Sequence, residues 1–405
     1  KKKMLFDHTN VSKRVMWGGN VLLFIFLLVL MVDPSDKVLH LKAIAFMSFV
    51  AYNAAFLKPD FTFLPSLLMP FIAVVCGLLS SQILGVPIDA DFAIATCKAF
   101  STLILLLWVR YYNFLRVAKY TAIIFAFLAI CIFLAAASNK LIRAGLWTFQ
   151  EQHEHCFDLA NRSFLGVELF GISFNSTIST TLPLFAATYA FLTVKKHRFW
   201  NFLEMCLVTT LFIISCSRST MMLPFVILSL AFYLRYKDSK YVKLMIYPIV
   251  LLIGVGLVVL IFKFASEKGE TSNTIKFAHL YSYGKLFHYN PEYFILGQGA
   301  GSYFFTFGFR RMVTLTEWNY LEILRICGLF SVGIFYILIY PFYYLKGFLK
   351  DKFTFGITVS YFVFLLVAGT NPMLLGSSGM SVMLMIYCFM SRFYKTNNTT
   401  HIRTT

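Results

Sequence analysis

The sequence predicts an all-α polytopic membrane protein with about 12 transmembrane helices and one large outer loop before the tenth helix. Composition is the first observation behind this fold class: the 405-residue chain is 59% hydrophobic and only 13% charged, which excludes an ordinary soluble domain. The second is that apolar runs of about 20 residues recur along the whole chain, each long enough to cross a hydrocarbon core of about 30 Å. The third is that Lys and Arg gather in alternate connections between these runs.

The apolar runs give the expected spans in chain order. Residues Lys1–Arg14 are polar and basic, and the run after them has no small-residue cleavage site, so we expect this run to be the first span. No long repeat and no linker divides the chain, so residues 1–405 are expected to form one membrane domain. The expected spans are 15–33, 38–57, 62–81, 93–111, 119–137, 172–193, 201–217, 219–236, 241–262, 323–345, 354–372 and 378–394.

The distribution of basic residues predicts the orientation. With both termini in the cytoplasm, the inner segments hold about 22 of the 36 Lys and Arg residues, and nearly all of the +18 net charge lies on that side. Topology therefore explains the charge, and no nucleic-acid partner is required. Segments 138–171 and 263–320 then become the two large outer loops. The inner segments are Lys1–Arg14, Lys58, Arg110–Lys119, Lys195–Arg198, Arg235–Lys243, Lys346–Lys352 and Arg392–Thr405.

Cysteines and histidines do not predict a metal centre. The eight cysteines are scattered, mostly inside spans, without a disulfide framework or the spacing of a zinc site. The first outer loop carries His153 and His155 among acidic residues, but their spacing matches no helical ligand pair. We therefore expect no metal cofactor.

Arg218 is a candidate functional residue because a guanidinium at the end of an apolar helix is unfavourable in hydrocarbon. It lies at a tight reversal between two spans and is flanked by Ser217 and Ser219. Its planar fork suits the oxygens of a phosphate or diphosphate. The alternative is an interfacial arginine that reaches lipid headgroups.

Glu317 lies where the chain re-enters the membrane after the second outer loop. A carboxylate held near apolar surface can become a general base, whereas the alternative is an ordinary helix start, where acids are favoured. Glu322, about a turn deeper, is expected either to partner Glu317 or to pair with Arg325.

Further polar residues have both functional and structural interpretations. Arg310 and Arg311 lie among aromatic residues, which suits a sugar phosphate and equally a loop in the headgroup zone. The glycines from Gly297 to Gly301 allow backbone N–H groups to approach a phosphate, or simply form a sharp turn. Lys42 and Lys98 are expected to have a buried polar partner or to line a cavity, and Lys98 and Arg162 are candidates for ligand contact.

Residues 160–345 resemble the superfamily of bacterial O-antigen polymerases and O-antigen ligases. The resemblance depends on the order of several short motifs, each only moderately specific. These are Ser217-Arg-Ser219, Phe277-Ala-His-Leu280, Ser282-Tyr-Gly284, Asn290-Pro-Glu-Tyr-Phe-Ile-Leu-Gly-Gln-Gly-Ala-Gly301 and Thr316-Glu-x-x-Tyr-Leu-Glu-Ile-Leu-Arg-x-x-Gly-Leu329.

One departure selects a branch of this superfamily. Its ligases have a His-Asn pair eleven residues before the glycine of the re-entry helix, whereas this chain has Glu317 and Trp318 before Gly328. A glutamate at that position resembles the polymerase branch, and the comparison raises Glu317 from a helix start to a candidate catalytic carboxylate.

The resemblance implies a GT-C-like inner-membrane polymerase that joins undecaprenyl-diphosphate-linked oligosaccharide units in its periplasmic loops, without a metal or nucleotide sugar. Glu317 would accept the proton of the attacking hydroxyl, and Arg218, with Arg310 or Arg311, would neutralise the departing diphosphate. Membrane lipids surround the chain, and a chain-length regulator protein is a candidate partner. The expected substrate-binding residues are Arg310, Arg311, Arg162, His279, Tyr283, Lys285, Lys98 and Arg325.

Other functions remain open at this stage. An O-antigen ligase, which transfers finished polymer to lipid A-core, is the nearest alternative, and the missing histidine argues against it. A lipid-linked oligosaccharide flippase belongs to another class, but a transporter does not need a capping loop of about 58 residues. A non-catalytic scaffold would leave the positions of Arg218 and Glu317 unexplained.

Overall fold

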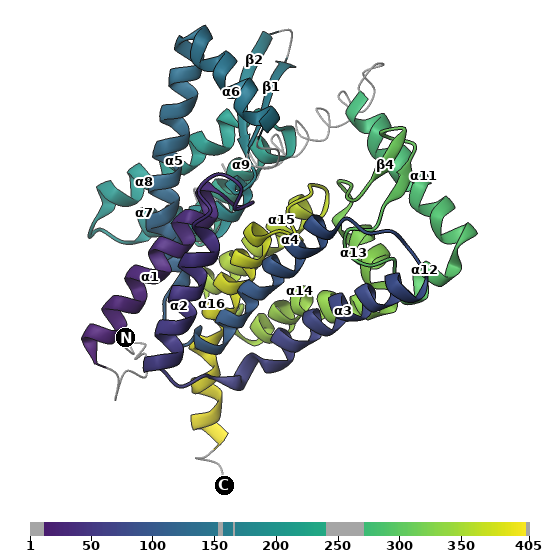
Figure 1. Cartoon of the computed structure of the whole chain (residues 1–405). Coiled ribbons are helices and arrows are strands. Elements are labelled where there is room, and N and C mark those ends of the chain that lie inside the picture. Colours follow the sequence, from purple (N-terminus) through teal and green to yellow (C-terminus); the bar gives the residue numbers. More distant parts are fainter. Residues whose placement is uncertain (1–11, 153–156, 165–166, 240–270, 402–405) are drawn as a thin grey trace.

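The computed structural model describes residues 12–152, 157–164, 167–239 and 271–401 and is mostly helical, at 76% (Figure 1). Seven helical segments of this described part are long and apolar enough to cross a membrane, so the chain is a multi-pass helical membrane protein. The predicted span 241–262 lies outside the described residues, as do residues 263–270 of the second predicted outer loop. The seven segments are Lys13–Val32, Phe61–Ile83, Ala90–Trp108, Phe114–Ser138, Ser219–Tyr236, Asn319–Phe348 and Lys352–Gly369.

The helices follow the apolar runs closely, with short 3-10 turns at several of their ends. In chain order they are α1 (Lys13–Val32), α2 (Lys42–Phe56), α3 (Leu64–Ile83), α4 (Ala90–Ser101), α5 (Phe114–Ser138), α6 (Lys140–Gln152), α7 (Thr181–Thr193), α8 (Arg198–Ile214), α9 (Arg218–Tyr236), α11 (Thr271–Tyr289), α12 (Pro291–Leu296), α13 (Asn319–Cys327), α14 (Val332–Leu345), α15 (Lys352–Gly369) and α16 (Ser377–His401).

The predicted span 172–193 is wrong in its first half. Residues up to Phe174 belong to a β-strand, a 3-10 turn occupies Thr177–Thr180, and α7 begins only at Thr181. Between this strand and α7, hydroxyl side chains bond to nearby backbone carbonyls: Thr180 donates to Thr177 and Thr181 donates to Ile178. Such local bonds compete with a regular helix.

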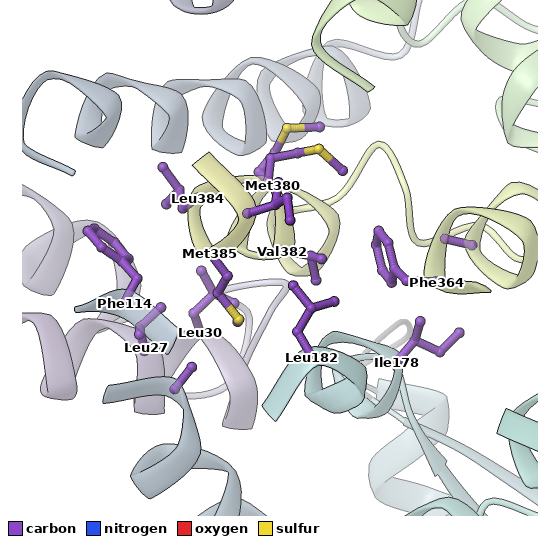
Figure 2. Packing of buried hydrophobic residues seen from close by; sticks show 14 of the residues in the cluster. Leu27, Leu30, Phe114, Ile178, Leu182, Phe364, Met380, Val382, Leu384 and Met385 are labelled. Atoms are coloured by element: carbon purple, nitrogen blue, oxygen red, sulfur yellow. The ribbon is translucent and has the colours of Figure 1, made fainter. Parts of the chain in front are cut away.

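Helix α16 lies at the centre of the bundle. Every residue from Ser377 to Met390 is buried, so this part of the helix is surrounded by other elements on all sides. Figure 2 shows Met380, Val382, Leu384 and Met385 of α16 beside side chains from other helices. These neighbours are Leu27 and Leu30 of α1, Phe114 of α5, Leu182 of α7 and Phe364 of α15.

Lys42 has the buried polar environment that was one of its two expected settings. Its side chain is buried at the start of α2, where Nζ donates to the carbonyl oxygen of Pro34 at 2.6 Å and lies 3.4 Å from Oγ of Ser377. The contact joins the start of α2 to the start of α16. A buried ammonium needs such partners.

Both predicted outer loops contain regular structure. The first holds α6 and an antiparallel pair, β1 (Phe157–Phe164) and β2 (Val167–Phe174). The second holds α11, α12 and a second pair, β3 (Phe304–Thr306) and β4 (Arg311–Val313). In Figure 1 these segments lie in the upper half of the view, whereas α1 begins and α16 ends in the lower half.

The segment between α12 and α13 is anchored on the bundle through α3 and α4. Asp89 caps α4 by accepting the backbone N–H of Phe92. Its own N–H donates to the carbonyl of Gly301 at 2.8 Å, and its carboxylate accepts the Tyr303 hydroxyl at 3.1 Å. The loop is therefore positioned by the helices.

We expect Gly77→Ala to destabilise the protein, because a Cβ at Gly77 of α3 would overlap the backbone carbonyl oxygen of Ile326 in α13. Overpacking of this kind costs about 1–3 kcal/mol. The matched control is Gly145→Ala in α6, where a Cβ meets nothing within 4 Å and a gain of about 0.5–1 kcal/mol is expected. Unfolding in detergent measures both, and equal effects of the two changes would contradict this packing.

Candidate functional site

A fully buried arginine, Arg325, forms with Glu322 and Tyr283 a hydrogen-bonded group that we call the frame of the candidate site. Arg325 of α13 has no exposed surface, and all five of its N–H groups point at acceptors. Nε and Nη2 each lie 2.8 Å from Oε2 of Glu322, and Nη2 donates to the carbonyl of Thr314 at 2.8 Å. Nη1 reaches the Gln298 side chain at 3.0 Å and both oxygens of Ser302 at 2.6 and 3.1 Å.

Glu322 is satisfied on both of its oxygens. Its Oε2 holds Arg325, and its Oε1 accepts the Tyr283 hydroxyl at 2.5 Å and the backbone N–H of Thr316 at 2.8 Å. Burial and the Glu322 charge raise the pKa of Tyr283 well above its usual value, so this hydroxyl remains protonated and donates. The pairing of Glu322 with Arg325 that the sequence suggested is present.

Arg325 is therefore part of the frame and does not belong with the substrate-binding residues. A guanidinium that has given every donor to the protein has none left for a ligand. The same argument applies to Tyr283, because its ring is buried and its hydroxyl lies between Glu322 and Thr316, 2.7 Å from the Thr316 hydroxyl.

The glycine run caps α13 instead of holding an anion. The N–H of Gln298 donates to the carbonyl of Arg325 at 2.7 Å, and the N–H of Gly299 donates to Ile326 at 3.0 Å. These carbonyls are otherwise unsatisfied at a helix end. Gly297, Gly299 and Gly301 all have φ near +82° to +85°, which L side chains rarely adopt. The sharp-turn interpretation of this run therefore fits the structure.

Glu317 forms an open ion pair beside this closed frame. Its Oε2 lies 3.0 Å from Nζ of Lys276, and the two side chains are 33% and 28% exposed. The backbone of the pair is held by Trp318, whose indole N–H donates to the carbonyl of Lys276 at 3.0 Å. Glu317 precedes α13, which begins two residues later at Asn319, so it is outside the helix and its carboxylate reaches solvent.

The sequence alone does not predict a role for Lys276, because it indicates an outer loop over 263–320 and not a helix. Once 271–289 is a helix, Lys276, His279 and Tyr283 share one face at the i, i+3, i+7 spacing. That face meets the segment 314–318 through Glu317 and Thr316. The spacing was visible in the sequence, but the polar and aromatic composition hid the helical period.

His279 lies one turn along α11 from Lys276. It is buried, its ring packs edge-to-face on Phe309 at a centroid distance of 4.6 Å, and neither ring nitrogen has a hydrogen-bond partner among the described residues. Burial lowers its pKa, while the charges of Glu317 and Glu322 act in the opposite direction. A neutral imidazole thus lies between the open pair and the closed one.

The turn between β3 and β4 presents basic and aromatic side chains. Arg310 and Arg311 are exposed, and the Arg311 guanidinium lies 5.8 Å from the ring centroid of Phe309. Lys285 lies 4.9 Å from the ring centroid of Phe307, and Phe309 contacts His279. The turn therefore packs along α11 between His279 and Lys285.

Arg218 lies at the same end of the bundle as Glu317. It is the first residue of α9, and Asp238 just after α9 pairs with Lys352 at the start of α15. Helices α9 and α15 are in contact and of similar length, so this pair makes them antiparallel. Residue 218 is then level with Thr370 at the far end of α15, whose carbonyl lies 3.5 Å from Nζ of Lys276.

Lys98 and Arg162 lie on elements other than those that carry Glu317 and Lys276. Lys98 is exposed in the last turn of α4, nine residues and about 13 Å along the helix from Asp89. Arg162 is in β1, where its backbone pairs with Leu169. Both stay candidates from the sequence alone.

Comparisons of the chain with protein-family models, with curated proteins and with solved structures found no significant match. The site is therefore interpreted from its own residues.

We expect Arg325→Met to destabilise the protein by about 3–5 kcal/mol, because it leaves the Glu322 carboxylate buried without its cation. Arg325→Lys should recover little of this loss, since an ammonium cannot reach acceptors on three separate segments. The double variant Arg325→Met/Glu322→Gln should be more stable than Arg325→Met alone. Chemical unfolding in detergent measures the three, and a wild-type midpoint for Arg325→Met would contradict the frame.

We expect His279 to make stability depend on pH. Because the pKa of His279 is lowered in the folded protein, the unfolded chain takes up a proton at higher pH than the folded protein does. Around these pKa values the unfolded state holds more bound protons than the folded state, so stability rises with pH. This contribution is fully present above about pH 6.5 and is lost as the pH falls below it. The melting temperature of His279→Phe should therefore change less than that of the wild type between about pH 7.5 and pH 5.5. Parallel pH profiles would contradict the assignment.

Proposed function

We propose that the chain is a polymerase that joins undecaprenyl-diphosphate-linked oligosaccharide units at the periplasmic face of a bacterial inner membrane. The observation that carries the proposal is the open Glu317–Lys276 pair, mounted on a closed frame beside a turn that exposes Arg310 and Arg311. A carboxylate that is one-third exposed and paired with one lysine, beside a turn that carries further cations, suits a reaction that takes a proton from a neutral hydroxyl and releases a polyanion. The motif order around Glu317 and Arg218 supports the same class.

Charge distribution supports the periplasmic placement. The basic connections predicted to be cytoplasmic include Lys352 and Arg392, which belong to the end of the bundle opposite Thr370 and Glu317. With about 22 of the 36 Lys and Arg residues in those connections, the positive-inside rule puts the site-bearing end outside. Twelve spans, with the segment 263–320 as a periplasmic loop, fit this arrangement.

The proposed reaction is a single displacement at an anomeric carbon. The oxygen of an acceptor hydroxyl forms a bond to that carbon, and the bond from the carbon to the diphosphate oxygen breaks with its electron pair leaving on undecaprenyl diphosphate. Glu317 accepts the hydroxyl proton and later gives it to water. Atoms and charge balance without a metal or a nucleotide sugar.

The reaction also requires stabilisation of the departing diphosphate, and cations at the same end of the bundle supply it. Arg218, together with Arg310 or Arg311, neutralises the negative charge that develops on the leaving diphosphate. The exposed aromatic side chains of the turn, Phe305, Phe307 and Phe309, are suited to stack on the faces of sugar rings. Removal of one such electrostatic contact typically lowers the rate by about 10²–10³.

We expect Glu317→Gln and Arg218→Ala each to reduce long-chain glycan to single repeat units while the protein is still made. The glutamine keeps the shape of Glu317 but cannot accept a proton, and the alanine removes a charge from the diphosphate. The measurement is the glycan length distribution on gels from strains with equal protein levels. Lys352→Met, which breaks an ion pair at the other end of α15, is the control and should leave lengths unchanged.

The outcome of gene deletion separates the neighbouring functions. A polymerase null strain should retain one repeat unit on the lipid A-core, whereas a ligase null strain should retain none. Turnover of lipid-linked substrate by purified protein in detergent, without a membrane potential, would exclude a transporter. Wild-type glycan lengths in the Glu317→Gln strain would remove Glu317 from the mechanism.

A further inference from the structure

The two glutamates of the segment from Glu317 to Arg325 form ion pairs of opposite character. Glu322 and Arg325 are both fully buried, and each has several other partners. Glu317 and Lys276 are about one-third exposed and meet through one contact of 3.0 Å. The first pair is fixed by its surroundings, whereas the second is open to a ligand.

We infer that Lys276 is a diphosphate-binding residue that exchanges partners, pairing with Glu317 in the free protein and with the diphosphate of the lipid-linked donor in the complex. The inference rests on the proposed function and adds a residue that the motifs do not contain. An exposed ion pair contributes little to stability, so opening it is easy. A diphosphate offers Lys276 more negative charge than one carboxylate does.

The backbone around this pair is fixed while the charged ends are not. The Trp318 indole N–H holds the carbonyl of Lys276 at 3.0 Å. Asn319 donates its side-chain amide to the carbonyls of Ala368 and Asn371 at the end of α15. The lysine stem has four rotatable carbons and a compact ammonium, so Nζ can move while the helices keep their places. Its second contact, to the Thr370 carbonyl, is long at 3.5 Å.

The exchange would couple donor binding to proton transfer. While Lys276 contacts Glu317, its ammonium covers Oε2 of the carboxylate. When Nζ moves to the diphosphate, that oxygen becomes free to accept the proton of the acceptor hydroxyl. The bond changes are those of the proposed reaction, and Lys276 contributes only its charge to the departing diphosphate.

The test is the affinity of purified protein in nanodiscs for undecaprenyl diphosphate. We expect Lys276→Met to weaken binding about tenfold or more, and Lys276→Arg to keep affinity within about threefold of the wild type. Glu317→Gln should bind the lipid at least as tightly as the wild type, because Lys276 no longer has to leave a carboxylate. Lys352→Met is the matched lysine control and should bind normally.

Lys276→Met and Glu317→Gln should have opposite effects on the affinity for undecaprenyl diphosphate, and this difference distinguishes partner exchange from a structural role. A purely structural ion pair would be lost equally in Lys276→Met and Glu317→Gln, so both would weaken binding together, and that result would overturn the inference. Normal binding by Lys276→Met would overturn it as well. If the wild-type protein binds no undecaprenyl diphosphate and makes no polymer, the proposed function itself fails. Melting temperatures of all variants show whether any has simply unfolded.

Discussion

The buried guanidinium of Arg325 is the interaction on which the geometry of the site depends. It joins three stretches that are separate in the sequence: Glu322 on its own helix, the loop that carries Gln298 and Ser302, and Thr314. A buried charge is tolerated only when its hydrogen bonds are complete, so these stretches have one arrangement in which the arginine is satisfied. That arrangement determines where the chain leaves the β3–β4 pair and therefore where Glu317 lies.

The site consists of a buried part, whose polar groups are bonded to one another, and a partly exposed part, whose charged groups are less constrained. The frame residues Arg325, Glu322 and Tyr283 are buried and mutually bonded, and the glycine turn closes the end of α13. Glu317 and Lys276 lie at the edge of this frame with their backbones held and their charged ends partly in solvent. This division suits a site that must hold one geometry and still exchange contacts with a charged substrate.

The sequence predicted a multi-pass helical membrane protein because the apolar runs are long and their ends are marked by charge. It also suggested the Glu322–Arg325 pair and the buried setting of Lys42, since a charge placed inside an apolar run needs a partner. The two strand pairs were missed, although Phe157 and Leu159, like Ile172 and Phe174, alternate as buried residues along their strands. A single strand pair inside a polar loop gives a weak period-2 signal.

Residue roles in the site were harder to predict than the fold. Arg325 was expected to bind substrate because a motif shows only that an arginine is present, whereas its burial and five satisfied donors are tertiary facts. Lys276 was overlooked because α11 buries little apolar surface and contains Gly284, so its helical period is faint in the sequence. The proximity of Lys276 to Glu317, 41 positions later in the chain, follows only from the fold.

The most direct measurement is an experimental structure of the protein in a lipid nanodisc with undecaprenyl diphosphate bound. The account predicts that the diphosphate contacts Nζ of Lys276 near a Glu317 carboxylate that has lost its lysine, while Arg325 keeps all its partners. A diphosphate bound away from α11 and the β3–β4 turn, with the Glu317–Lys276 contact intact, would contradict it.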